Sequence, residues 1–194
     1  FPCSHRNLFR ANANYKSNDE VIPLADIYDQ KVQSYWLAST AYPEFDSLTE
    51  EIKKDVCVVG GGIAGMTTAY RLCEAGCATV LLDAGRIGYG VTGYTTAKLT
   101  SQHQLIYDRL IKALGRDRAQ AYAGANQSAI DWVEETIDRE GIDCDFTRLP
   151  AYVYAEADKD LKDLEKEQKA YEKLGLPGGI TANTGLPFPV PGAL

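Results

Sequence analysis

The feature that most constrains the fold is the stretch 56–83, in which two short apolar runs flank a glycine-rich turn and a helix-like segment. The turn, residues 60–65, reads Gly-Gly-Gly-Ile-Ala-Gly, a Gly-x-Gly-x-x-Gly pattern. Glycines at this spacing, between a strand and a helix, are typical of the βαβ unit that seats a dinucleotide. The sequence therefore predicts strands over 56–59 and 79–83, with a helix between them.

Each glycine of the turn has an expected task. Gly60 permits the tight turn, Gly62 lets a phosphate approach the backbone, and Gly65 lets the helix pack closely on the sheet. We expect the first N–H groups of the helix, at Ile63 and Ala64, to have no acceptor in the protein. An anion is favoured there because a helix N-terminus carries partial positive charge.

Asp83 ends the second apolar run, roughly 20 residues after the first glycine, where a carboxylate accepts hydrogen bonds from ribose hydroxyls. The same charge repels a 2′-phosphate, which disfavours NADP. We expect this carboxylate to face the ligand crevice. The loop that follows, residues 84–100, is rich in glycine and threonine, and such a loop can wrap an extended ligand.

The remaining chain reads mostly as helix. Apolar residues recur at helical spacing over 105–114 and 119–137, with Gly115 between the segments and Gly141 after the second. Residues 157–174 carry many charges beside one apolar stripe, which indicates a helix with solvated charges. Residues 146–149 and 152–155 read as strands around a proline.

Composition excludes several classes of function. The net charge of −7 argues against nucleic acid or an anionic membrane as partner, and no apolar run approaches the roughly 20 residues of a membrane span. Five cysteines at irregular spacing, with two histidines, predict neither a metal site nor a disulfide framework. Cys57 is expected to be a small core residue. Reduced thiols favour a cytoplasmic location.

From Ser34 to Leu194 the chain resembles the FAD-dependent oxidoreductases of the D-amino-acid oxidase and glycine oxidase type. Residues 58–65 match the ADP-binding turn of that family, and residues 83–88 are similar to its acid-x-Gly-Arg segment. Residues 93–103, Gly-Tyr-Thr-Thr-Ala-Lys-Leu-Thr-Ser-Gln-His, are similar to a branch that carries a C-terminal Rieske iron–sulfur domain.

The resemblance implies FAD as cofactor, with its adenosine end on Asp83, its pyrophosphate on the turn 60–65 and its flavin toward the loop 90–98. It implies oxidation of a small amine or amino acid by hydride transfer to FAD, with electrons passing to an iron–sulfur domain in a C-terminal part. No side chain is assigned as catalytic, and His103 is expected to be a polar surface residue. The candidate cofactor-binding residues are Gly60, Gly62, Ile63, Ala64, Gly65, Asp83, Ala84, Arg86, Gly90, Thr92, Gly93, Thr95, Thr96 and Lys98.

The predicted fold class is α/β, an incomplete Rossmann-like FAD/NAD(P)-binding domain with the beginning of an antiparallel substrate domain, since only two runs suit a parallel sheet. We expect an irregular N-terminal arm over 1–33, an FAD-binding portion over 34–143 and a truncated substrate domain over 144–194. The apolar patch 34–37 is expected to pack on the nucleotide portion. Two alternatives stay open: a fragment of an NAD-dependent dehydrogenase, and a non-catalytic or interaction fragment.

Overall fold

The structure is a computed structural model that describes residues 34–40 and 43–194. The predicted arm over 1–33 lies outside the described residues. The chain divides into two compact units, residues 1–97 and 98–194. The predicted domain boundary after residue 143 stays a prediction.

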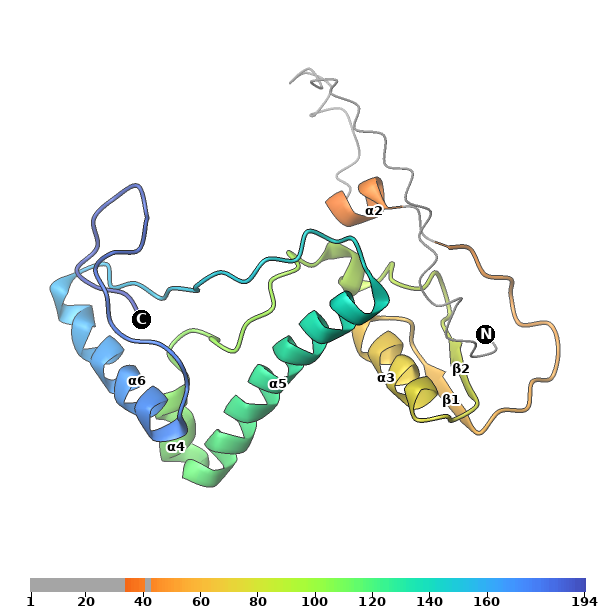
Figure 1. The fold of residues 1–194 in the computed structure, drawn as a ribbon, viewed down its shortest axis with the longest axis horizontal. Coiled ribbons are helices and arrows are strands. Elements are labelled where there is room, and N and C mark those ends of the chain that lie inside the picture. The colour runs from red at the N-terminus through yellow and green to blue at the C-terminus, as the bar shows by residue number, and fades with distance from the viewer. Residues whose placement is uncertain (1–33, 41–42) are drawn as a thin grey trace, which may run out of the picture. The chain divides into compact units, whose positions relative to one another are not determined.

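The first unit contains the expected βαβ element. Strand β1 (Val56–Val59) leads into helix α3 (Ile63–Glu74), and strand β2 (Thr79–Leu82) follows (Figure 1). The strands pair in parallel, with Val56 opposite Thr79 and Val59 opposite Leu82. Beyond the end of α3, Gly76 takes a φ of 80°, in the region that glycine adopts without strain. The prediction of two parallel strands joined by a helix is confirmed.

The second face of this small sheet is only partly covered by the residues that the structure describes. Helix α3 packs on one face, and on the other face Val59 is 81% exposed whereas Val80 is 7% exposed. A shallow groove on this face is lined by Leu48, Ile52, Lys54, Cys57, Val80 and Leu82. The expectation that Cys57 lies in the core is wrong, because its side chain lies on the face opposite α3 and is exposed.

Two short helical turns complete the first unit. Helix α2 (Tyr35–Ser39) contacts the 3₁₀ turn η1 (Val91–Tyr94), which lies in the loop after β2. Leu37 of α2 is only 8% exposed. The apolar patch 34–37 therefore packs on the nucleotide portion, as predicted.

The second unit is built from three helices and a 3₁₀ turn: α4 (Tyr107–Leu114), α5 (Arg116–Glu140), η2 (Asp158–Asp160) and α6 (Leu161–Leu174). Gly115 separates the first two, and Gly141 ends α5 in the left-handed conformation. Both glycines act as the sequence predicts. The core of this unit consists of Tyr107, Ala119, Ala123, Ala155, Leu164, Ala170, Tyr171, Leu174 and Leu194.

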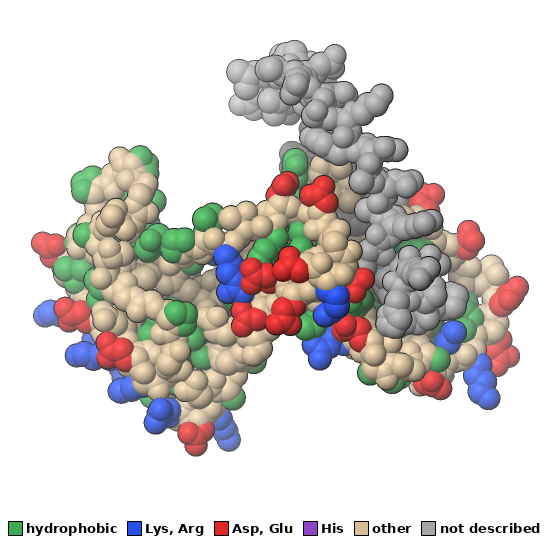
Figure 2. Space-filling view, in the orientation of Figure 1, with side chains coloured by type: hydrophobic (Ala, Val, Ile, Leu, Met, Phe, Trp, Pro, Cys, Tyr) green, Lys and Arg blue, Asp and Glu red, His purple; other side chains and the backbone are tan. Residues whose placement is uncertain are grey.

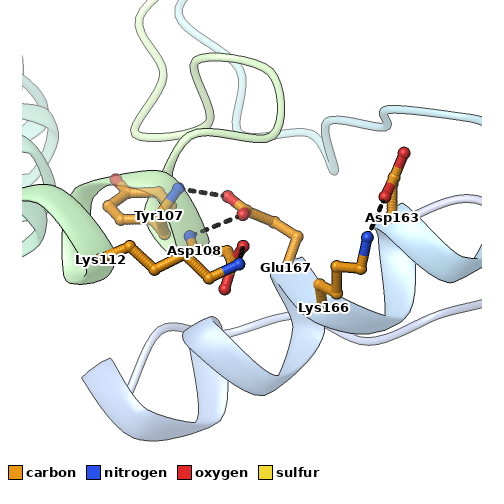
Figure 3. A network of polar contacts seen from close by, with 6 residues as sticks. All are labelled: Tyr107, Asp108, Lys112, Asp163, Lys166 and Glu167. Carbon is orange, nitrogen blue, oxygen red and sulfur yellow. Dashed lines mark hydrogen bonds and ion pairs between the residues drawn. The ribbon is translucent and has the colours of Figure 1, made fainter.

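Helix α6 is not solvated along all of its charged positions. Glu167 is 1% exposed, and its carboxylate accepts hydrogen bonds from the N–H groups of Tyr107 at 2.6 Å and Asp108 at 2.9 Å (Figure 3). These N–H groups begin α4 and have no partner within that helix. The expectation of solvated charges is wrong at Glu167, because the side chain lies on the apolar stripe and caps a neighbouring helix.

The strands predicted around Pro150 are only partly present. Residues 146–149 form no strand, and Leu149 is 78% exposed. Tyr154 forms a single antiparallel bridge with Ala193, which also bridges Thr181. Backbone pairing in this part of the chain is thus confined to short contacts with residues 192–194, and a wider antiparallel sheet is not seen among the described residues.

Acidic side chains gather on the surface over the C-terminal half of α5 (Figure 2). Arg148 balances part of this charge, with its guanidinium 2.5 Å from Asp131 and 2.6 Å from Glu134. Within the part of the chain that the structure describes, no helix has the length and apolarity needed to cross a membrane.

Candidate dinucleotide-binding site

The glycine turn joins β1 to α3 and is closed by main-chain contacts. The N–H of Gly60 donates to the carbonyl of Leu82 at 2.7 Å, and Gly60 takes a φ of 107°. A Cβ placed on Gly65 would lie 1.8 Å from the Gly60 carbonyl oxygen and 3.6 Å from Leu81. Gly65 therefore permits α3 to approach both the turn and β2, and any side chain there would force the turn open.

Asp83 lies at the end of β2 and bonds directly to the turn. Its Oδ2 accepts the N–H of Gly61 at 2.6 Å, and its Oδ1 accepts the N–H of Gly85 at 2.7 Å. These two hydrogen bonds, the Gly61 bond foremost, lower the pKa of the Asp83 carboxyl below its ordinary value. Each oxygen of a carboxylate has further acceptor capacity, so the exposed, charged group can still receive hydroxyl donors from outside.

The first N–H of helix α3 is not free. Ile63 donates to the hydroxyl oxygen of Thr92 at 2.8 Å. The expectation of an unoccupied N–H at Ile63 is therefore wrong, because the loop after β2 folds back over the helix start. Among the described residues, no protein acceptor bonds the N–H groups of Gly62 and Ala64. A hydroxyl that accepts one hydrogen bond retains its own proton to donate, so Thr92 presents a donor in place of the one it covers.

The loop after β2 is tied to the turn at a second point. Gly88 donates its N–H to the Gly61 carbonyl at 2.8 Å. A Cβ on Gly61 would lie 2.9 Å from Ile87 Cγ1, so the two segments are closely packed. The structure thus brings together the turn, Asp83 and Thr92 in the first unit.

The other candidate residues are less closely associated. Arg86 pairs with Glu44 at 3.3 Å and lies 5.3 Å from the Tyr89 ring centroid. Thr95 accepts the N–H of Ala97 at 3.2 Å through its hydroxyl. The others are arranged along the loop: Ala84 follows Asp83, Gly90 precedes η1, Gly93 lies buried within η1, and Thr96 is exposed. Lys98 begins the second unit, and its role as a cofactor ligand stays a prediction.

His103 belongs to the second unit. Its Nδ1 lies 2.9 Å from the hydroxyl of Tyr122, and its side chain is exposed. A polar surface residue was expected at this position.

Sequence reasoning missed two contacts at the site. One is the bond between Thr92 and Ile63, and the other is the bond from Trp36 Nε1 to the Thr95 carbonyl at 2.6 Å. The threonine-rich composition of the loop indicated ligand contact but not which hydroxyl reaches the turn. An indole followed by a leucine, ahead of the first strand, was the only signal for the second contact.

The family described as "FAD dependent oxidoreductase" (DAO) matches residues 55–185 of the chain. This match covers the βαβ unit, the loop and most of the second unit.

Curated relatives match the chain over most of its length. YhfW of Bacillus subtilis, whose name describes a Rieske 2Fe-2S iron–sulfur protein, is 39% identical over 80% of this chain and 31% of its own. Gamma-glutamylputrescine oxidoreductase of Escherichia coli is 37% identical over 75% of this chain and 34% of its own. OrdL of Haemophilus influenzae, named as an oxidoreductase, is 30% identical over 72% of this chain and 33% of its own. The chain spans about a third of the length of these relatives. No solved structure matches it.

Proposed function

The chain belongs to the FAD-dependent oxidoreductase family, and we propose that its first unit holds the ADP half of FAD at the turn 60–65. The observation that carries the proposal is the junction of three elements at one point. Asp83, from the end of β2, is bonded to Gly61 of the turn, and Thr92, from the loop, is bonded to the first N–H of α3. A diphosphate and a ribose require these two kinds of partner, N–H or O–H donors and a carboxylate, side by side.

The diphosphate would be held by donors at the start of α3. The N–H groups of Gly62 and Ala64 and the hydroxyl of Thr92 are the donors available there. The partial positive charge of the helix N-terminus adds to their attraction for an anion. The turn 60–65 therefore offers the donors that a diphosphate needs, although one of them comes from a side chain.

The adenosine ribose would be held by Asp83. Its carboxylate is charged and exposed, and its bonds to Gly61 and Gly85 fix its orientation. The shared turn and acid suit NAD as well as FAD, and the family match selects FAD. Ala84, Arg86, Gly90, Gly93, Thr95, Thr96 and Lys98 are proposed as further contacts along the cofactor.

The whole protein is proposed to oxidise a small amine or amino acid. One relative is named as an oxidoreductase of gamma-glutamylputrescine, and another is named as a Rieske iron–sulfur protein. FAD, when bound, supplies the acceptor for the two electrons and hydrogen removed from the carbon that bears the amine. An iron–sulfur domain as electron acceptor, a substrate domain that begins within 144–194 and a cytoplasmic location belong to the same proposal.

Equilibrium binding of FAD to the 194-residue chain, followed by quenching of flavin fluorescence, tests the proposal. Asp83→Asn keeps the shape of the side chain and replaces one acceptor by a donor, so it should weaken FAD roughly 10-fold or more. Asp163→Asn, on exposed α6, is the matched control and should leave affinity unchanged. Failure of the parent chain to bind FAD, or equal binding by parent and Asp83→Asn, contradicts the proposed site.

A further inference from the structure

Helix α2 lies ahead of the βαβ unit in the sequence, yet it is bonded to the loop that reaches the glycine turn. Trp36 is half-buried, and its Nε1–H donates to the Thr95 carbonyl at 2.6 Å. Leu37 is buried against η1, since a Cβ on Gly93 would lie 2.8 Å from Leu37 Cδ2. Two consecutive residues of α2 thus fix both the middle and the end of η1.

The same turn η1 contacts the start of α3. Thr92 accepts the N–H of Ile63 at 2.8 Å, and a Cβ on Gly62 would lie 3.3 Å from the Thr92 hydroxyl oxygen. Thr92 precedes the residue packed on Leu37 and lies three positions before the acceptor of Trp36. The position of the Thr92 hydroxyl therefore depends on how α2 holds η1.

The 3₁₀ turn η1 has few stabilising contacts of its own. Its own hydrogen bonds are Gly93 N–H to Gly90 at 3.0 Å and Thr95 N–H to Thr92 at 3.4 Å. Short 3₁₀ turns have poor hydrogen-bond geometry and gain little from local bonding. The side chains of Val91 and Tyr94 are 90% and 62% exposed and contribute little packing. Contacts with other elements must therefore determine where η1 lies.

We propose that Trp36 and Leu37 are positioning residues for the cofactor site, which act by holding the Thr92 hydroxyl against the start of α3. This inference rests on the proposed function, because Thr92 is there a donor to the diphosphate. Residues ahead of the βαβ unit thereby set the affinity of a site that they do not touch. Loosening α2 moves the Thr92 hydroxyl and uncovers the Ile63 N–H. One of the donors proposed to hold the diphosphate is then out of place.

Amide exchange at Ile63, measured by NMR on the 194-residue chain without FAD, tests the positioning itself. Trp36→Phe keeps an aromatic ring and removes the indole donor, and Leu37→Ala removes the packing on Gly93. Both should accelerate exchange at Ile63 severalfold relative to the parent. Leu72→Ala, at the other end of α3 and half-buried, is the control and should leave Ile63 exchange at the parent rate.

Titration with FAD tests the consequence for binding. Trp36→Phe and Leu37→Ala should each raise the FAD dissociation constant about 3- to 10-fold, as expected for one hydrogen bond. In a Thr92→Val background, Trp36→Phe should have no further effect, because it acts through the missing hydroxyl. Thr92→Ser should retain both the parent affinity and the sensitivity to Trp36→Phe.

Several results would overturn the inference. Unchanged Ile63 exchange in both variants contradicts the positioning, and so does an equal acceleration in Leu72→Ala. If Trp36→Phe weakens FAD binding as much in the Thr92→Val background as in the parent, the effect does not pass through Thr92 and the inference is wrong. If Leu37→Ala does not fold, Ile63 exchange and FAD affinity in Trp36→Phe test the inference. A parent chain that binds no FAD contradicts the proposed function, and with it the binding half of the inference, while Ile63 exchange still reports on the positioning.

Discussion

Asp83 in the first unit and Glu167 in the second each accept two main-chain N–H groups, at 2.6 and 2.7 Å for Asp83 and at 2.6 and 2.9 Å for Glu167. Glu167 is 1% exposed and surrounded by core side chains, whereas Asp83 is exposed. The same pattern of hydrogen bonds to main-chain N–H groups therefore has a different role in each unit. Burial devotes Glu167 to joining two helices, and exposure leaves Asp83 free to receive further donors.

The largest effect on stability is expected from substitution of Glu167. Removing its carboxylate leaves the buried N–H of Tyr107 and the part-buried N–H of Asp108 without acceptors, so Glu167→Ala should destabilise the second unit by about 3–5 kcal/mol. Chemical denaturation followed by Trp132 fluorescence, in a Trp36→Phe background, reports on this unit alone because the chain has two tryptophans. Glu165→Ala, exposed on the same helix, is the control and should change little. Equal effects of the two variants would place Glu167 outside the core.

Alkaline pH acts on the same junction through Tyr107. Burial, followed by the nearby Tyr171, Tyr122 and Glu167, raises the pKa of Tyr107 to about 12. The unfolded chain ionises first, near pH 10, so the contribution of neutral Tyr107 is complete below pH 10 and is lost as pH rises to about 12. By about pH 11.5 the loss should reach about 2 kcal/mol.

Denaturation of the parent and of Tyr107→Phe between pH 8 and about 11.5 measures this loss. The variant should lose most of the pH dependence, although Tyr171, whose pKa burial also raises, leaves a remainder. A parent chain whose stability is flat over this range would contradict the buried environment of Tyr107.

An added side chain in the glycine turn should destabilise the first unit. Gly65→Ala places a Cβ 1.8 Å from the Gly60 carbonyl oxygen, and relief of the clash should cost the first unit about 1–3 kcal/mol. Trp36 fluorescence, in a Trp132→Phe background, reports on this unit. Gly124→Ala is the matched control, since a Cβ there meets nothing within 4 Å and alanine favours the helix. A Gly65→Ala variant as stable as the parent would show that the turn is not closed as described.

The smallest effect is expected from acid at Asp83. Its two N–H bonds lower the pKa below the ordinary 3.8, so the charged form and both bonds persist from neutral pH to pH 5 and are lost only as pH falls through the lowered value. NMR titration of the Gly61 and Gly85 amides should therefore show a midpoint below pH 3.8. Asp83→Asn removes the titration and serves as the control. A titration midpoint at or above pH 3.8 would contradict the bonds.

The elements of the fold were largely predictable because glycine acts locally. Gly60, Gly115 and Gly141 take positive φ values at element ends, and their neighbours show clear strand or helix patterns in the sequence. The same local reading identified the turn and Asp83, since both depend on spacing along a single βαβ unit.

The wrong predictions concern residues whose burial or hydrogen bonds depend on segments distant in the sequence. Whether Cys57 is buried depends on what covers the second face of the sheet, which residues 56–59 do not specify. Glu167 carries a charge but lies on an apolar stripe, and its partners are the N–H groups of another helix. The occupied N–H of Ile63 depends on the return of the loop at Thr92, and no local pattern encodes that return.

The face of the β1–β2 sheet opposite α3 carries an exposed thiol that can be modified chemically. Cys57 lies there beside the groove lined by Leu48 and Ile52, and its thiol is accessible to solvent. A maleimide or iodoacetamide reagent should therefore modify this cysteine in the isolated chain, and mass spectrometry after proteolysis separates it from Cys144, which is also accessible. The rate of alkylation at Cys57 then serves as a footprint of anything that comes to cover the sheet.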